Sequence, residues 1–339
     1  MAAIGAFISG CSGTSLTDRE ISFFQRAAPW GLILFKRNCE TPDQLKALTS
    51  AFRSAVGRRD APVFVDQEGG RVQRLGPPSN AWRKYPPARA YGDLYAVDAV
   101  KSLRSARHVG RLMAEDLIAA GITVDCVPVL DVPQPDAHDI IGNRAYSMNR
   151  EEIMALARAH VAGLLDGGVL PVIKHIPGHG RARADSHLAL PVVDASKVEL
   201  AGHDFPPFAA FADAPMAMTA HVVYSAIDKA APATLSAKVI KKVIRGEIGF
   251  RGLLMTDDLS MKALSGSYAE KTSRALEAGC DLVLHCNGDL AEMEEVAAAA
   301  GILKGKALRR AKAALKMARK PQPFDRRAAL RDLQALVTG

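Results

Sequence analysis

A carboxylate pair directly follows one of the most apolar segments of the chain. Residues 252–256 are followed by Asp257 and Asp258. A carboxylate presented at the end of a buried strand, beside a polar rim, suits a nucleophile that attacks the anomeric carbon of a sugar. The spacing alone does not distinguish the two residues. An Asp can also cap the helix that follows, and we favour that interpretation for Asp258.

Two further groups of residues could handle protons or bind a ligand. Lys174 and His175 follow an apolar run, and Asp185 and His187 come shortly afterwards. A buried lysine and histidine are costly without a polar partner, and we expect a bound ligand to be that partner. Asp185 could orient His187 and raise its pKa, which would make a general acid/base. The alternative is a zinc site formed by His175, His179 and His187.

Two loops add polar groups that suit a small polar ligand. Asp66 ends an apolar run and is followed by Gly69-Gly70, where the backbone can approach a ligand closely. The Asp66 carboxylate could accept two hydroxyl hydrogens at once. Arg144 could act as a forked donor. The alternative for the segment after Asp66 is a tight turn with surface arginines. The alternative for Arg144 is a solvated loop arginine.

The elements that must position these residues alternate along the chain. Short apolar, β-branched runs alternate with longer helical patterns, which is typical of βα units and a parallel sheet. Eight strands are predicted, at 4–9, 31–35, 62–66, 123–131, 169–175, 214–221, 252–257 and 281–286. Helices are predicted at 41–56, 98–120, 150–166, 197–212, 237–247 and 261–278. Eight strands predict a (β/α)₈ barrel, whose active sites lie where the strands end.

We therefore predict an α/β fold in which residues 1–339 form one catalytic domain. The barrel would span about 4–300, and a basic helix would follow at about 301–320. Residues 303–320 contain eight Lys or Arg and no acid, so the rest of the chain is balanced: 44 − 8 = 36 basic against 36 acidic residues. A nucleic-acid patch is one interpretation. We favour the solvent face of a helix whose other face carries Leu308, Ala311, Leu315 and Ala318.

The composition of the chain indicates where the protein is located and which partners it binds. The five cysteines are scattered without a CxxC pair, and no apolar run reaches the roughly 18 residues that would span a bilayer. Residues 8–11 resemble a lipoprotein processing box, but only seven residues precede this box and none is basic, so we assign it to the first strand. We expect a cytoplasmic monomer that binds neither nucleic acid nor membranes.

Taken in order, the motifs resemble those of family 3 glycoside hydrolases. The segments DQEGGRVQR, KHIPGHG, DSH and TDDLSM occur between residues 66 and 261, and the resemblance covers about residues 4–286. It is strongest to bacterial β-N-acetylhexosaminidases of peptidoglycan recycling. It implies that Asp257 is the nucleophile and that His187, supported by Asp185, is the acid/base. Residues implied to hold the N-acetylglucosamine unit are Asp66, Arg74, Arg144, Lys174 and His175.

The resemblance also implies a substrate and a form of the enzyme. The short chain is similar to single-domain Gram-negative enzymes that hydrolyse N-acetylglucosaminyl-anhydro-N-acetylmuramyl saccharides and peptides without a metal or other cofactor. Ile176 stands where the family usually has an aromatic residue, which affects packing under the loop rather than the chemistry. Two other functions stay open: a metal-dependent barrel hydrolase and a catalytically silent sugar-binding barrel. The sequence does not define the aglycone or the openness of the 176–190 loop.

Overall fold

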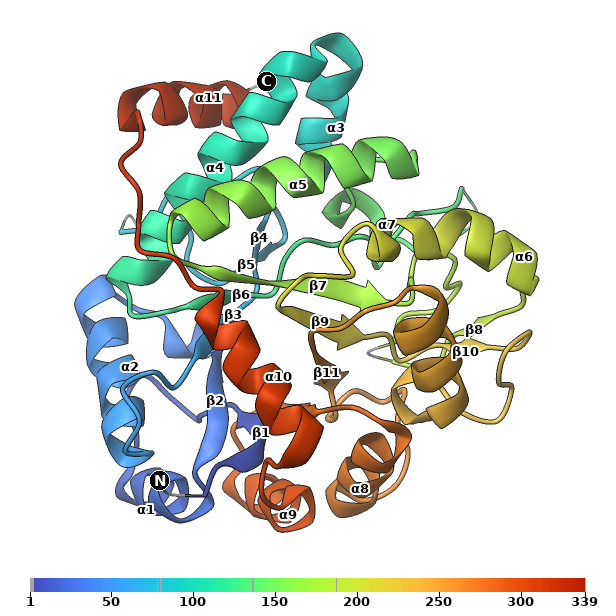
Figure 1. The fold of residues 1–339 in the computed structure, drawn as a ribbon. Helices are drawn as coiled ribbons and strands as arrows, with labels where there is room; N and C mark the ends of the chain where they lie inside the picture. Colours follow the sequence, from blue (N-terminus) through green and yellow to red (C-terminus); the bar gives the residue numbers. More distant parts are fainter. Residues whose placement is uncertain (1–2, 78, 80, 136, 187, 339) are drawn as a thin grey trace.

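A closed barrel of eight parallel strands forms the centre of the molecule (Figure 1). The computed structural model describes residues 3–77, 79, 81–135, 137–186 and 188–338. The strands follow one another around the barrel in the order β1, β12, β11, β9, β7, β6, β3, β2. Their bounds are β1 Gly5–Ser9, β2 Pro29–Leu34, β3 Val63–Val65, β6 Val124–Asp125, β7 Leu170–Ile176, β9 Met216–Thr219, β11 Leu253–Asp258 and β12 Leu282–His285. Each predicted strand overlaps one of these, so the predicted barrel is confirmed.

The strands are apolar because both of their faces are covered. Every residue of β2 and β7 is buried, as expected for a parallel sheet with side chains filling the barrel and helices packed outside. The outer helices are α1 Asp18–Ala27, α2 Pro42–Ala55, α3 Ala88–Val97, α4 Ala99–Ala119, α5 Arg150–Asp166, α6 Lys197–Glu199, α7 Phe205–Ala209, the π-helical segment Val239–Glu247, α8 Tyr268–Ala278 and α9 Leu290–Ala300. Two small sheets in the loops pair β4 Gln67–Gly69 with β5 Val72–Gln73, and β8 Val192–Val193 with β10 Val223–Tyr224.

Three predicted elements are shorter or more broken than expected. The strand predicted at 123–131 is regular only over β6, because Pro128 lacks the N–H that would continue the ladder. The helix predicted at 197–212 is divided into α6, a π-helical turn at Leu200–Asp204, and α7, which contains Pro206. The helix predicted at 261–278 begins only at Tyr268, because Ser267 and Glu270 form a capping box there.

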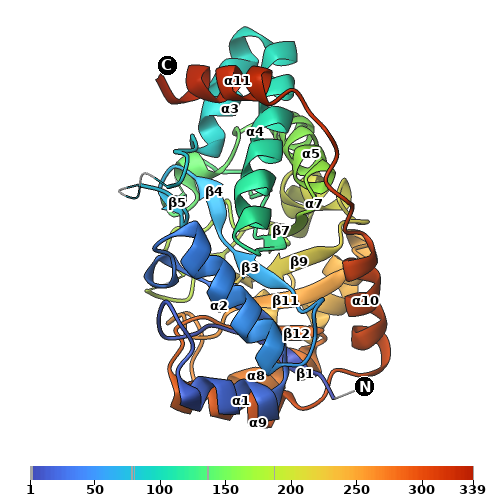
Figure 2. The same cartoon turned by 90° about the vertical axis from the view of Figure 1, so that its left-hand side faces the viewer.

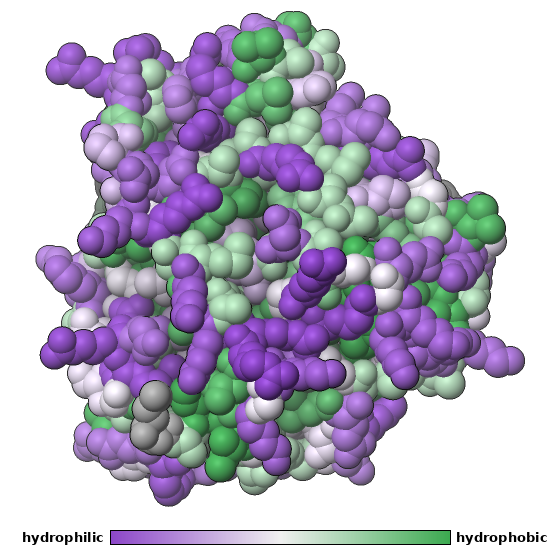
Figure 3. Space-filling model, in the orientation of Figure 1, coloured by the Kyte–Doolittle hydropathy of each residue, from purple (hydrophilic) through white to green (hydrophobic). Residues whose placement is uncertain are grey.

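The chain after the barrel forms two helices, of which only one was predicted. The basic run forms α10 Gly305–Lys316, which buries Ala311 and Ala314 and crosses the end of the barrel where the strands begin. Hydrophilic side chains cover this region of the surface (Figure 3). The interpretation as a solvated helix face is therefore supported, although Ala318 is exposed rather than packed.

The second C-terminal helix, α11 Arg326–Thr338, packs against α4 on the side of the barrel (Figure 2). Asp332 of α11 fixes this contact, because it binds Arg104 at 3.1 Å and His108 at 2.8 Å. Among the described residues, none of the helices combines the length and apolar character that a membrane-spanning segment needs.

Candidate active site

A cleft of about 320 Å³ lies where the barrel strands end. The residues that line it come from seven of the barrel strands, β2, β3, β6, β7, β9, β11 and β12, or from the segments that follow them. Six of the eight predicted site residues line the cleft: Asp66, Arg74, Arg144, Lys174, His175 and Asp257. Apolar side chains complete the wall, including Ile33, Phe35, Ile140, Ile141, Met218, Met261 and Leu284. The predicted placement of polar groups at the carboxyl ends of the strands therefore brings most of them together.

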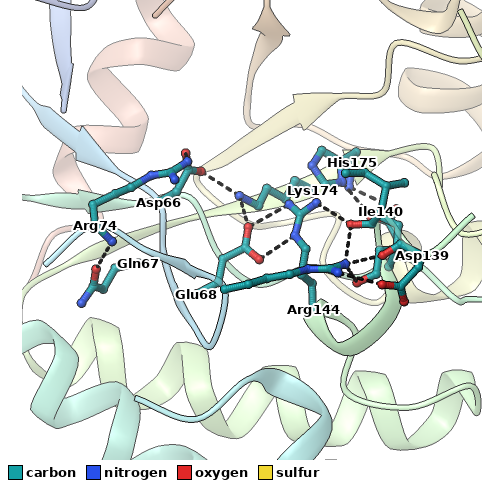
Figure 4. A network of polar contacts seen from close by, with 12 residues as sticks. Asp66, Gln67, Glu68, Arg74, Asp139, Ile140, Arg144, Lys174 and His175 are labelled. Carbon is teal, nitrogen blue, oxygen red and sulfur yellow. Dashed lines mark hydrogen bonds and ion pairs between the residues drawn. The ribbon is translucent and has the colours of Figure 1, made fainter. Parts of the chain in front are cut away.

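The ammonium group of Lys174 lies at the centre of a buried ion network (Figure 4). Its Nζ lies 2.8 Å from Asp66 Oδ1 and 2.6 Å from Glu68 Oε1, and the side chain is only 2% exposed. The partners of Lys174 are thus carboxylates of the protein itself. The expectation that a bound ligand would be its partner was wrong, because a charge this deeply buried needs a permanent counter-charge.

Two arginines extend this network on either side. Arg144 donates from Nε and Nη2 to the two carboxylate oxygens of Glu68, at 2.8 and 2.9 Å. Arg74 Nη2 binds Asp66 Oδ2 at 3.0 Å. We call these five residues the charged clamp: Asp66, Glu68, Arg74, Arg144 and Lys174. A carboxylate has about four lone-pair positions, so Asp66 can still accept hydroxyl groups of a ligand while it holds both cations.

Glu68 is the member of the charged clamp that sequence reasoning missed. It lies two residues after Asp66, but the sequence did not indicate a function for it. The signal that could have found it is charge balance, because Lys174 and Arg144 need buried counter-charges. The Arg144 loop is itself fastened to the same segment, since Arg71 Nη1 binds Asp139 Oδ2 at 2.8 Å.

The close pairing keeps the clamp ionised. Burial alone would lower the pKa of Lys174, but the carboxylates of Asp66 and Glu68 raise it above its ordinary value. Burial alone would likewise raise the pKa of Glu68, but Arg144 and Lys174 lower it to about 2. The clamp therefore presents fixed charges to a ligand throughout the neutral range.

His175 is held by a second carboxylate, Asp131, which is the last residue of the strand predicted at 123–131. Asp131 Oδ2 lies 2.7 Å from His175 Nδ1, and Asp131 Oδ1 accepts the backbone N–H groups of His175 at 3.2 Å and His179 at 2.6 Å. Asp131 is completely buried. It fixes the orientation of the His175 ring, whose other nitrogen remains available to a ligand or to a neighbouring carboxylate.

Asp257 lies in the cleft beside two histidines. Burial would raise its pKa, but the nearby His175 and His221 and the backbone N–H of Asp258 keep the pKa below its ordinary value. The Asp258 N–H donates to Asp257 Oδ1 at 2.8 Å. Asp257 is therefore an ionised carboxylate within the cleft, and ionisation is the state a nucleophile needs.

Asp258 does not cap a helix, so that interpretation was wrong. It is the last residue of β11, and its Oδ1 accepts the backbone N–H groups of Ser260 at 3.0 Å and Cys286 at 3.2 Å. The next helix, α8, begins only at Tyr268, ten residues after Asp258, and is capped by Ser267. Asp258 instead holds the turn after β11 against the end of the neighbouring strand.

The structure describes only one of the two residues predicted to form the acid/base pair. His187 lies outside the described residues, and Asp185, in the same loop, is not among the residues that line the cleft. Ser186 between them does line the cleft, and its Oγ lies 3.1 Å from His179 Nε2. The dyad therefore stays a prediction. Among the described residues no group of three or more His, Cys, Asp or Glu side chains could hold a metal ion.

The buried position of Glu68 predicts a pH-dependent contribution to stability. Its pKa is about 2 in the folded protein against 4.5 ordinarily, so its ion pairs stabilise the fold above pH 4.5 and this contribution disappears as the pH falls toward 2. The shift corresponds to roughly 3 kcal/mol at neutral pH. We expect urea unfolding to show Glu68→Gln clearly less stable than wild type at pH 7, with the difference shrinking below pH 4.5. A difference that does not change with pH would contradict the pairing.

The fold and the site together define a (β/α)₈ barrel with an ionised carboxylate, Asp257, and the charged clamp in one cleft where the strands end. The model of the glycosyl hydrolase family 3 N-terminal domain matches residues 25–318. The beta-hexosaminidase of Alkalilimnicola ehrlichii is 40% identical over 288 residues, which cover 84% of this chain and 81% of that protein. The beta-hexosaminidase of Methylococcus capsulatus is 41% identical over 279 residues, covering 81% and 80% of the two chains.

A solved structure shows the same arrangement over almost the whole chain. NagZ from Neisseria gonorrhoeae, in complex with N-trifluoroacetyl-D-glucosamine, superposes with a TM-score of 0.88 at 33% identity and covers 99% of both chains. This chain therefore belongs to glycosyl hydrolase family 3, in its β-hexosaminidase group, and is a glycoside hydrolase. The resemblance carried by the four sequence motifs is confirmed at the level of family and fold.

Proposed function

We propose that this protein is a retaining β-N-acetylglucosaminidase that removes terminal N-acetylglucosamine from peptidoglycan fragments. The observation that carries the proposal is the position of ionised Asp257 in the same cleft as the charged clamp. A related structure, NagZ from Neisseria gonorrhoeae, holds an N-acylated glucosamine. The clamp suits such a sugar, because fixed cations and carboxylates can bind neighbouring hydroxyl groups as donors and acceptors.

In the proposed reaction, Asp257 attacks the anomeric carbon and forms a covalent glycosyl-enzyme. His187, oriented by Asp185, protonates the departing oxygen and then removes a proton from the water that releases the sugar. The clamp and His175 hold the sugar ring over Asp257 during both steps. Asp131 orients His175. Ser186, next to His187 in the chain, contacts His179, and this contact supports the proposal that the His187 loop lies at the cleft.

We further propose that residues 1–339 act as one catalytic unit, without a cofactor, on N-acetylglucosaminyl-anhydro-N-acetylmuramyl saccharides and peptides in the cytoplasm. The cysteines Cys11, Cys39, Cys126, Cys280 and Cys286 are free thiols, which suits a reducing compartment. A zinc-dependent reaction is not favoured by the described residues, because Asp131 engages His175 and Ser186 engages His179. A monomer remains our prediction.

A digest of purified anhydro-muropeptides tests the substrate. We expect mass spectrometry to show loss of one N-acetylhexosamine from each disaccharide, with or without a peptide stem, and unchanged activity in the presence of a chelator. Hydrolysis of a nitrophenyl N-acetylglucosaminide without any cleavage of muropeptides would contradict the proposed substrate while leaving the proposed activity. Failure on both substrates would contradict the activity itself.

A further inference from the structure

A buried carboxyl beneath the cleft holds the segment that carries two members of the charged clamp. Asp125 is the last residue of β6 and is completely buried. Its Oδ1 accepts the backbone N–H of Gln67 at 2.9 Å. Gln67 stands between Asp66 and Glu68, the two carboxylates that bind Lys174. Since Val65 of β3 pairs with Asp125 in the barrel, this contact ties the end of one strand to the loop leaving its neighbour.

The side chain of Gln67 also fixes the backbone of a third member of the clamp, Arg74. Its Oε1 accepts the backbone N–H groups of Arg74 at 3.1 Å and Leu75 at 3.0 Å, and its Nε2 donates to the Leu75 carbonyl at 2.8 Å. Figure 4 shows Gln67 facing Arg74 on the side of the network away from Arg144. The backbone positions of Asp66, Glu68 and Arg74 therefore depend on one residue, which is itself anchored on Asp125.

The surroundings of Asp125 indicate that it acts through its oxygen and not through a negative charge. Burial raises its pKa well above the ordinary value; the Gln67 hydrogen bond and Lys174 oppose this rise, and Asp66 and Glu68 add to it. Its second oxygen, Oδ2, has no hydrogen-bond partner among the described residues. A neutral carboxyl still accepts the Gln67 N–H through Oδ1, so the support does not require ionisation.

We propose that Asp125 is a positioning residue of the charged clamp, acting as a hydrogen-bond acceptor for the Gln67 backbone and thereby setting the spacing of Asp66 and Glu68 around Lys174. This inference rests on the proposed function, because it takes the clamp to be the part of the site that binds the sugar. It assigns a role in sugar binding to a residue that lies beneath the cleft and does not line it.

Two substitutions of similar shape distinguish the effect of losing the hydrogen-bond acceptor of Asp125 from the effect of losing its charge. Asp125→Asn keeps an oxygen that can accept the Gln67 N–H, whereas Asp125→Leu removes it and leaves a buried N–H unpaired. The readouts are KM and kcat on 4-nitrophenyl N-acetyl-β-glucosaminide and the inhibition constant of free N-acetylglucosamine. We expect Asp125→Asn to stay within about 3-fold of wild type, and Asp125→Leu to bind N-acetylglucosamine about 10-fold more weakly, with KM affected more than kcat.

A second buried carboxyl provides the matched control. Asp281 accepts the backbone N–H of Leu254 at 2.9 Å, but at the opposite end of the barrel. Asp281 also pairs with Arg245 and Arg310, both at 2.8 Å, so Asp281→Asn should lower the melting temperature. KM and the inhibition constant should stay unchanged, which is the signature of a merely structural role. If Asp125→Leu does not fold, Asp125→Ala removes the same acceptor without added volume and takes its place.

The proposal is overturned if the Leu or Ala variant, once folded, binds N-acetylglucosamine as tightly as wild type. It is also overturned if Asp125→Asn loses as much affinity as Asp125→Leu, because the charge would then be required. A wild-type enzyme that neither binds N-acetylglucosamine nor turns over the substrate contradicts the proposed function instead, so the two failures are distinguishable.

Discussion

Replacing Asp257 with Ala should lower turnover by at least about 10⁴-fold, on aryl and natural substrates alike, because no covalent intermediate can form without the carboxylate. Asp258→Ala should keep most of its activity. The side chain of Asp258 holds the Ser260 and Cys286 N–H groups, so its loss should cost about 1–3 kcal/mol of stability and disturb the turn after β11. Steady-state kinetics and urea unfolding of both variants check this contrast.

Asp257→Asn is the control for this comparison, because it preserves the size of the side chain and the acceptor for the Asp258 N–H. It should fold like wild type and remain inactive. Comparable residual activity in Asp257→Ala and Asp258→Ala would overturn the assignment of the nucleophile.

Replacing His187 with Ala should reduce kcat/KM far more for a disaccharide than for a nitrophenyl glycoside. A sugar oxygen is a poor leaving group that needs protonation, and such proton transfer contributes about 10²–10⁴-fold, whereas a nitrophenolate leaves without help. Release of the sugar from Asp257 uses the same histidine to activate water, so this step should become limiting for the aryl substrate. Rapid mixing should then show a burst of nitrophenol.

Asp185→Asn should give a weaker form of the same pattern, because the imidazole remains but is less basic and less well oriented. The measurement is a series of aryl glycosides with different leaving groups, compared among wild type, His187→Ala and Asp185→Asn. If both substrate classes lose equally and no burst appears, His187 binds sugar or packs the loop, and the acid/base is unassigned.

The sequence was sufficient for the barrel and for most of the cleft, because both depend on patterns that are local in the chain. Each barrel strand is a short apolar run, and Asp66, Lys174 and Asp257 stand at the ends of such runs. The parallel order then brings those ends to one face of the barrel. Residues as far apart as Asp66 and Asp257 can therefore be predicted to share a site before any contact is known.

What could not be predicted are the partners of those residues. A bound ligand was expected to be the partner of Lys174. Its partner Glu68 lies 106 residues away in the chain, and only the folded structure shows that the two charged groups are in contact. Asp131 ends the strand predicted at 123–131, but its contact with His175 depends on the direction of its side chain. The late start of α8 likewise reflects local capping by Ser267 that overrides a helical pattern.

The stereochemistry of the first-formed product tests the central claim most directly. If Asp257 forms a covalent glycosyl-enzyme, two displacements occur at the anomeric carbon and the β configuration is retained. ¹H NMR recorded within the first minutes of hydrolysis of a β-N-acetylglucosaminide should show the β-anomer of N-acetylglucosamine first, with the α-anomer growing in later by mutarotation. If the α-anomer appears first, water attacks the sugar directly, and Asp257 is not the nucleophile.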